Sequence, residues 1–294
     1  MQDIKGITAQ LQAWINQMMS AGKVVDIDAL NHHLAEMMTV QNSTPIDRFN
    51  GFTSEQMHQM IYSPLEKGCP VQLRTLTDSQ LNDIPLMRQV LHLMDILDKS
   101  ELKLTAKGYI PPKIVEELYQ MGTHSWNTDW YKQKSEPKTE EIRVLRVVLK
   151  ECGLVKTRTG KMSLTSKGKR LLINRNELLR VVMLFLLRDY NTGWLDLWDD
   201  TDVGNLGRMY SLWLLHHYGK EWRHTDFYAG EYSRAFPTLA NAHAYGYRVF
   251  NRLFHLIGLC DVNEREEDRG PGFWERVIKT DVLDMMFEFA EPGN

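Results

Sequence analysis

Apolar residues recur at helical spacing along most of the chain, and short alternating stretches separate some of these segments. In the first 85 residues, this spacing predicts helices over 11–19 and 28–38 and another that begins at Ser54. Asp28 is expected to cap the second of these helices. Farther along, the same periodicity predicts amphipathic helices over 86–97, 113–121 and 140–152. Most of the chain is therefore expected to be helical.

Three short stretches alternate apolar and polar residues as half-buried strands do. They cover 102–105, 154–158 and 161–165, and Thr159-Gly160 between the last two predicts a tight turn. The predicted order is helix, strand, helix, helix and β-hairpin. A further helix is expected after Lys167-Gly168.

A second copy of this order is predicted downstream. Gly258-Leu259-Cys260 repeats Gly153-Leu154-Val155 after 105 positions, and Thr280 takes the place of Thr165. A segment over 177–190 that is apolar on nearly every side predicts a buried helix between the copies. The elements expected in the second copy are helices over 206–218, 227–236, 241–257 and 282–289 and strands over 221–224, 260–265 and 273–280.

The element order over 82–175, with Gly153-Leu154-Val155 and the stretch 164–168, resembles the winged helix-turn-helix domains of bacterial regulators. The segment 124–137 departs from that pattern because it is longer than the usual turn between the second and third helices. The whole chain is similar to a family of uncharacterised bacterial proteins, through Phe49-Asn50-Gly51, the stretch 54–58 and the stretch 104–108. That resemblance implies an architecture but no activity. Some relatives carry a C-terminal Cys/His metal motif that 291–294 lacks, so we expect no metal.

These patterns together predict a mainly α fold with small β-hairpins, of the α+β class, with tandem winged-helix domains. We expect a helical N-terminal region over 1–81 and a basic winged-helix domain over 82–175. A connecting buried helix over 176–204 and an acidic winged-helix-like domain over 205–294 would follow.

Composition is typical of a folded protein, with 43% hydrophobic and 25% charged residues among 294, which argues against a disordered chain. The longest apolar run, 181–187, is much shorter than the ~20 residues that cross a bilayer, so no membrane span is expected. Cys69, Cys152 and Cys260 form no motif. We therefore expect buried, unpaired thiols and a cytoplasmic location.

The net charge of -3 conceals a strong separation along the chain. Residues 138–175 hold eleven Lys and Arg against three Glu, a net charge of +8. Residues 188–294 hold eleven basic and eighteen acidic residues, a net charge of -7. The first winged-helix domain is therefore the candidate for binding a polyanion.

The basic residues of this domain predict contact with duplex DNA through the helix 140–152 and the wing 154–165. At ~100° per residue, the helix places three of them on one face, opposite Leu145, Val148, Leu149 and Cys152. Arginine on a recognition helix can pair with guanine, and cations on a wing can contact phosphate. The nine candidates are Arg143, Arg146 and Lys150 on the helix, Lys156, Arg158 and Lys161 around the wing turn, and Lys167, Lys169 and Arg170 beyond it.

Two alternatives to DNA binding stay open, and the second domain is expected to have a different role from the first. The charged face could simply be solvated, and the protein would then be an interaction scaffold whose winged helices do not bind DNA. The acidic second domain is expected to bind protein or a second copy, because Glu266, Glu267 and Asp268 in its wing loop would repel a duplex. The other alternative is an enzyme, although the sequence has no catalytic motif and no cofactor motif; its candidate groups are Asp199, Asp200, Asp202, His216 and His217.

Two other groups of side chains have a structural and a functional interpretation. Trp126, Trp130 and Tyr131 are expected to hold their loop against the core, with base stacking or a partner contact as the alternative. Methionines of the N-terminal helices are expected to fill a core, with an adaptable partner groove as the alternative. These are Met18, Met19, Met37, Met38, Met57 and Met60.

Overall fold

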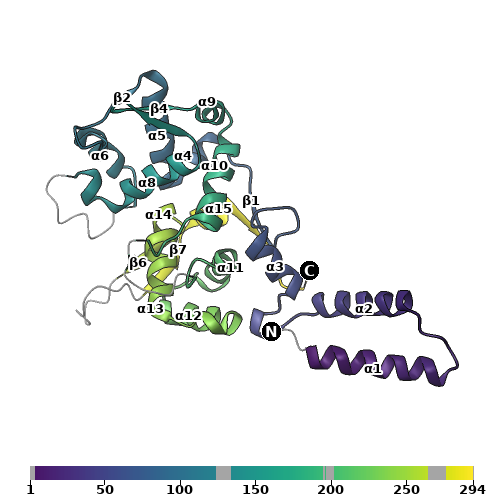
Figure 1. Ribbon diagram of the computed structural model, residues 1–294. Helices are drawn as coiled ribbons and strands as arrows, with labels where there is room; N and C mark the ends of the chain where they lie inside the picture. Colours follow the sequence, from purple (N-terminus) through teal and green to yellow (C-terminus); the bar gives the residue numbers. More distant parts are fainter. Residues whose placement is uncertain (1–3, 124–133, 195, 197–201, 264–275, 294) are drawn as a thin grey trace. The chain divides into compact units, whose positions relative to one another are not determined.

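A computed structural model describes residues 4–123, 134–194, 196, 202–263 and 276–293 (Figure 1). The chain forms two compact units, one of Met1–His58 with Glu291–Asn294 and one of Gln59–Ala290. We call them the N-terminal unit and the main unit. Helices dominate, and the strands form small antiparallel sheets, so the predicted mainly α class with small β-hairpins is confirmed.

The N-terminal unit consists of a helical hairpin followed by short elements. The N-cap of its second helix is Asp26, whose carboxylate accepts a hydrogen bond from the Ala29 amide at 2.8 Å. The predicted cap, Asp28, lies inside the first turn, because only a residue with extended backbone can aim its side chain at the free amides. The elements are α1 (Ile4–Ser20), α2 (Ile27–Asn42), η1 (Asp47–Phe49) and the start of α3 (Ser54–Tyr62).

The first half of the main unit has the predicted order of helix, strand, helix, helix and hairpin. We call it the first module. Its three strands form a sheet in the order β2-β4-β3. The elements are α4 (Asp78–Asp83), α5 (Pro85–Lys99), β2 (Leu102–Lys103), α6 (Pro112–Tyr119), η2 (Glu136–Lys138), α8 (Glu140–Glu151), β3 (Val155–Arg158), β4 (Lys161–Leu164) and α9 (Ser166–Ile173).

The second module repeats this order, and its sheet has the equivalent strand order β5-β7-β6. The predicted helix over 241–257 is present, but its central nine residues are π-helical. The elements are α11 (Arg208–Tyr218), β5 (Arg223–His224), α12 (Thr225–Ala235), η4 (Pro237–Leu239), α13 (Ala242–Tyr245), η5 (Gly246–Phe254), α14 (His255–Ile257), β6 (Cys260–Asn263), β7 (Arg276–Lys279) and α15 (Asp281–Met286).

The same backbone junction joins the third helix to the hairpin in both modules. Gly153 and Gly258 adopt left-handed φ values of 68° and 99°, which end each helix. The hydroxyl of Thr165 donates to the Gly153 carbonyl at 2.7 Å, and that of Thr280 donates to the Gly258 carbonyl at 2.6 Å. The equivalence of the two glycines and two threonines, predicted from their spacing, is therefore confirmed.

The predicted buried helix between the modules consists of α10 (Arg175–Leu184) and a π-helical turn, η3 (Phe185–Asp189), and one side of it is fully buried. The prediction for the C-terminal end was wrong in part. Helix α15 ends at Met286, and β8 (Phe287–Phe289) then pairs antiparallel with β1 (Val71–Leu73). Pairing with a strand some 210 positions away decides this conformation, and local periodicity cannot reveal it.

All three cysteines are free and buried, as expected. Burial raises the pKa of the Cys152 thiol to about 12, so this group is an unreactive apolar side chain at neutral pH. Among the described residues, no helix combines the length and the apolar character that crossing a bilayer requires.

Alanine substitution at the two junction glycines separates backbone strain from packing. A left-handed φ costs an alanine roughly 1–2 kcal/mol at either position. A Cβ at Gly153 would lie 3.9 Å from the Lys167 side chain, whereas a Cβ at Gly258 would lie 2.5 Å from the Pro85 ring of α5. We expect Gly258→Ala to lower the free energy of unfolding by about 1–3 kcal/mol more than Gly153→Ala. Urea unfolding measures both, and equal losses would contradict tight packing of α5 against Gly258.

Candidate nucleic-acid interface

Helix α8 holds the residues that the sequence predicts to read DNA. Its apolar side packs into the first module, where Leu145, Val148 and Leu149 are buried as predicted. Ile142 and Val144 are buried as well, so the helix is covered over more of its circumference than one face. Lys150 is exposed, and Arg143 and Arg146 are half-buried. The helix therefore presents less open surface than its periodicity suggests.

Arg146 is bound by groups of its own chain. Its Nη1 lies 2.8 Å from Oε1 and 2.9 Å from Oε2 of Glu136 and donates to the Gly108 carbonyl at 2.8 Å. Glu136 is 6% exposed and also accepts from the Ile110 amide at 2.7 Å. The guanidinium therefore neutralises a buried carboxylate and joins η2 and the 108–110 turn to α8. A phosphate would have to displace that carboxylate.

The first turn of α8 contacts the second half of the main unit. Glu140 forms an ion pair with Arg252 of η5, with Oε1 and Nε 3.1 Å apart. The guanidinium carbon of Arg143 lies 5.1 Å from the centre of the Trp194 ring, whose Nε1 donates to the Tyr190 hydroxyl at 3.0 Å. The expectation that Arg143, Arg146 and the wing share one open face is therefore not met at the helix.

The wing, in contrast, is open. Strand alternation directs Met162 and Leu164 into the core and their neighbours outward. On the outer side, Lys103, Lys161 and Arg158 stand opposite one another in register across β2, β4 and β3, and Lys156 lies opposite Ser163. All four cations are exposed. We call Lys103, Lys156, Arg158 and Lys161 the cationic face.

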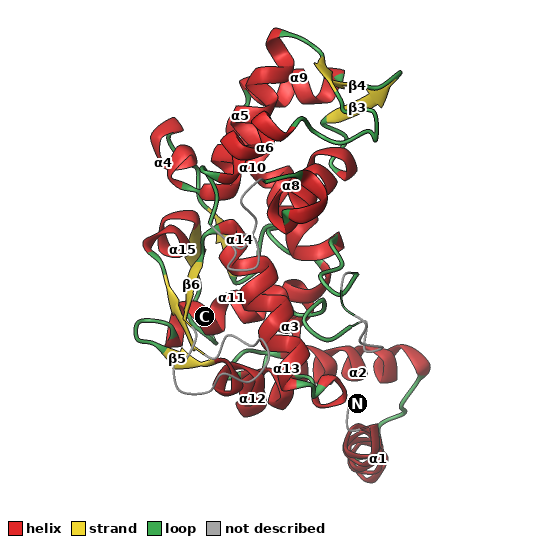
Figure 2. Ribbon diagram, turned by 90° about the vertical axis from the view of Figure 1, so that its left-hand side faces the viewer, coloured by secondary structure: helices red, strands yellow, loops and turns green. Residues whose placement is uncertain are grey.

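Three basic candidates continue from the wing onto α9. The Thr165 hydroxyl caps this helix by accepting from the Gly168 amide at 2.9 Å. Figure 2 shows β3, β4 and α9 together at one end of the main unit, and Lys167, Lys169 and Arg170 are exposed. Seven of the nine predicted residues are therefore exposed, and the two that are not are Arg143 and Arg146.

Carboxylates compensate only some of these cations. Lys161 pairs with Glu101 at 3.0 Å and Arg170 with Glu177 at 2.9 Å, in each case between partly exposed side chains. Lys150 pairs with its neighbour Glu151 at 3.1 Å. Of the seven exposed candidates, four have no carboxylate of a described residue within ion-pair distance: Lys156, Arg158, Lys167 and Lys169.

The second module shows what the same sheet looks like without this charge. Its matched positions, counted from the shared Gly–Thr junction, replace Lys156 by Asp261 and Arg158 by Asn263. The remaining two matches are Arg276 for Lys161 and His224 for Lys103. At these four described positions the second sheet thus has one carboxylate, one amide, one guanidinium and one imidazole. Because both sheets have the same topology, the cations of the first are not needed to form it.

Lys103 is not among the predicted residues, because it lies 35 positions before the basic segment 138–175. The strand over 102–105 was predicted, but its register against the wing was not, and only that register places Lys103 beside Lys161. Glu136 was also missed, since nothing in its local pattern identifies it as the acceptor for Arg146. Trp126, Trp130, Tyr131, Asp199, Asp200 and Glu266, Glu267 and Asp268 lie outside the described residues.

Of the residues named for an enzyme, the structure describes Asp202, His216 and His217. The Nδ1 atom of His216 lies 2.6 Å from Oδ1 of Asp284, and Oδ2 of the same carboxylate accepts from the Lys279 ammonium at 2.5 Å. This cluster joins α11, β7 and α15, and His216 stacks on Phe289 of β8. These contacts hold the elements against one another. Among the described residues, no group of three or more His, Cys, Asp or Glu side chains is placed to hold a metal ion.

Comparison of the chain with known protein families, with curated proteins and with solved structures finds no match.

Replacing Arg146 by methionine tests its role as the partner of Glu136. Of the hydrogen bonds to the buried Glu136 carboxylate that are described here, the substitution leaves only the one from the Ile110 amide. We therefore expect the free energy of unfolding to fall by about 3 kcal/mol. Chemical denaturation measures the loss. The matched variant Glu136→Gln/Arg146→Met also removes the uncompensated charge, so it should recover most of the lost free energy of unfolding. A single variant as stable as the native chain would contradict the buried ion pair.

The cluster around Asp284 predicts a loss of stability in acid. Burial raises the pKa of Asp284, but the hydrogen bonds from Lys279 and His216 outweigh that effect and hold the pKa below its ordinary value. The resulting stabilisation is present above the unfolded pKa of about 4 and is lost as the pH falls through the folded pKa. We expect Asp284→Asn to lower the Tm at neutral pH, with the difference from the native chain narrowing below about pH 4. A constant difference would contradict the assignment.

Proposed function

We propose that the main unit consists of two winged-helix modules and that the first binds the phosphate backbone of duplex DNA through the cationic face and α9. The observation that supports this most directly is the difference between the two sheets. One topology is used twice, and only the first copy places four cations on its outer side. Like charges directly opposite one another destabilise a sheet, so their presence at these positions favours an anionic ligand.

The chemistry of this surface suits phosphate better than base edges. Exposed Lys and Arg side chains on a sheet can each approach a phosphate oxygen, and binding releases condensed counterions from the duplex. Sequence is read mainly in the major groove by side chains of an inserted helix. Because Arg143 and Arg146 of α8 have partners in their own chain, we expect weak dependence on sequence and strong dependence on salt.

A scaffold function is the second candidate, and the coverage of α8 favours it. The contacts Glu140–Arg252 and Arg143–Trp194 use the helix face that a recognition helix would present to DNA. In that case the cationic face would be a solvated surface that also discourages edge pairing of β3. Neither function requires a cofactor, and the proposal includes a cytoplasmic location and no enzymatic activity.

The decisive experiment compares binding of the full chain to a labelled duplex of mixed sequence, about two helical turns long. Fluorescence anisotropy is recorded at low salt and then with increasing salt. Lys156→Gln/Arg158→Gln removes two exposed cations that form no ion pair with a described residue. We expect an affinity loss of about tenfold, and a slope of log K against log salt that is smaller by about two.

A matched control removes two charges elsewhere on the main unit. Lys67 and Lys220 are also exposed, and neither belongs to the wing or to α9. Lys67→Gln/Lys220→Gln should bind the duplex as the native chain does. An equal loss of affinity in both double variants would show that binding depends on the net charge of the protein and not on the cationic face. No binding by the native chain at low salt would overturn the DNA proposal and leave the scaffold function.

A further inference from the structure

The helical hairpin of the N-terminal unit has apolar positions at the spacing of a helical bundle. In α1, Ile7, Leu11, Trp14 and Met18 are four, three and four residues apart. In α2, the corresponding positions are Ile27, Leu30, Leu34 and Met37, at three, four and three residues. Alternation of three and four is the pattern with which helices pack side chains into the gaps of a facing helix. Each helix therefore has a continuous apolar seam.

The two helices do not bury these seams by themselves. No residue of α2 is fully buried, whereas eight of the fifteen residues of α5 in the main unit are. Apolar side chains in the seams and beside them remain in solvent: the seam residue Ile27 is 73% exposed, and Met19 and Val40 beside the seams are each 66% exposed. The expectation that the methionines fill a core is confirmed for Met57 and Met60 and is wrong for Met19 and Met38.

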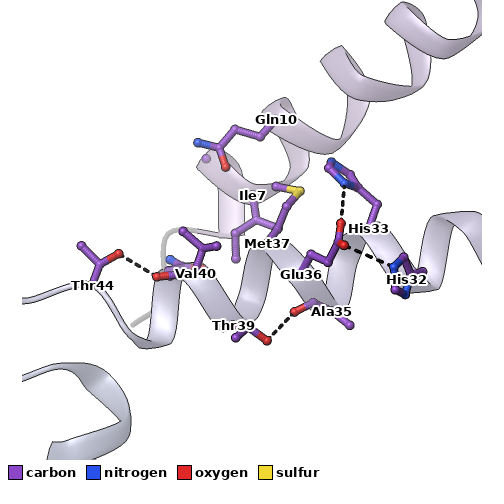
Figure 3. Close-up of a pocket in the computed structure, with 12 residues that line it drawn as sticks. Ile7, Gln10, His32, His33, Ala35, Glu36, Met37, Thr39, Val40 and Thr44 are labelled. Atoms are coloured by element: carbon purple, nitrogen blue, oxygen red, sulfur yellow. Dashed lines mark hydrogen bonds and ion pairs between the residues drawn. The ribbon is translucent and has the colours of Figure 1, made fainter.

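The uncovered surface of the hairpin includes a groove between its helices (Figure 3). It has a volume of about 920 Å³, and Ile7, Met37 and Val40 form its apolar part. Glu36 lies at the rim, 3.2 Å from His32 and 3.6 Å from His33. A second groove, of about 570 Å³, lies toward the connection between the helices and is lined by Ile15, Met19, Val24, Val25, Ile27 and Leu30.

We propose that a second copy of the chain covers this surface, so that two hairpins form a four-helix bundle. Helices α1 and α2 have 17 and 16 residues, so both are about 25 Å long, and a second hairpin matches them along their whole length. With helices about 10 Å wide, each hairpin contributes a face of about 500 Å², or about 1,000 Å² in total. That area reaches the lower limit for specific interfaces, whereas a single partner helix would cover about half of it.

Charge also favours a second copy over a strongly charged partner. Over residues 4–42 the hairpin carries two Lys against two Asp and one Glu, a net charge of -1. Two such hairpins repel one another little, and neither offers a cluster that would attract a polycation or a polyanion. The inference does not depend on the proposed DNA binding, which uses residues of the main unit only.

The test is the oligomeric state of the full chain in solution. Sedimentation velocity and light scattering, over about 1–100 µM, should give the mass of a dimer at the upper concentrations. Met19→Glu/Val40→Glu places charges at two largely exposed positions that the bundle would bury. We expect this variant to be a monomer, with a dissociation constant raised at least a hundredfold, or about 2.7 kcal/mol.

Two comparisons keep this result unambiguous. Ile173→Glu, at an 89% exposed apolar position on α9 of the main unit, makes the same kind of change outside the hairpin and should leave the dimer intact. The thermal unfolding of the main unit in each variant shows that the chain is folded. A native chain that is monomeric throughout the concentration range would overturn the proposal. So would a dimer that survives Met19→Glu/Val40→Glu, because its interface would then lie elsewhere.

Discussion

The buried carboxylate of Asp196 is the group on which the arrangement of the main unit depends. It forms a two-point ion pair with Arg248, whose side chain is fully buried, with both N–O distances 2.8 Å. Arg252, one turn along η5, also lies within 3.4 Å of the same carboxylate and forms the ion pair with Glu140 of α8. Because a buried charge is very costly without its partner, this segment, η5 and the start of α8 are held together. The coverage of the helix expected to read DNA follows from that constraint.

A second buried arginine shows how far the interior tolerates charge. Arg208 is 1% exposed and donates to the carbonyls of Leu186 and Gly204, and to Asn205 and Thr192. Burial lowers the pKa of this guanidinium to about 10, so it remains charged at neutral pH. The Leu186 carbonyl belongs to the π-helical turn η3, and π-helical segments often mark functional or strained places in a helix. In this chain, the π-helical segments lie beside the arginines that connect the modules.

Comparison of the two modules distinguishes the features that form the fold from those that differ on the surface. Both have the left-handed glycine, the threonine that bonds to its carbonyl and the same strand order. Their outer sheet surfaces differ in charge, and this difference is the basis for the proposed contact with DNA. A dimer through the N-terminal hairpins would present two cationic faces, and two linked sites bind an extended polyanion more tightly than one.

Features that depend on residues close together in the chain could be predicted from the sequence. The predicted turn at Thr159-Gly160 is present, with both residues at left-handed φ values of 48° and 70°, because a tight hairpin turn requires that conformation. The apolar face of α8 and the repeat of the Gly–Thr junction were likewise readable from spacing alone. Only the tertiary structure decided which cations are open. Glu136 reaches Arg146 across ten positions, and Arg252 reaches Glu140 across more than a hundred. Ion pairs at such separations leave no periodic pattern in the sequence, because their energy depends on burial and distance, which the folded chain alone fixes.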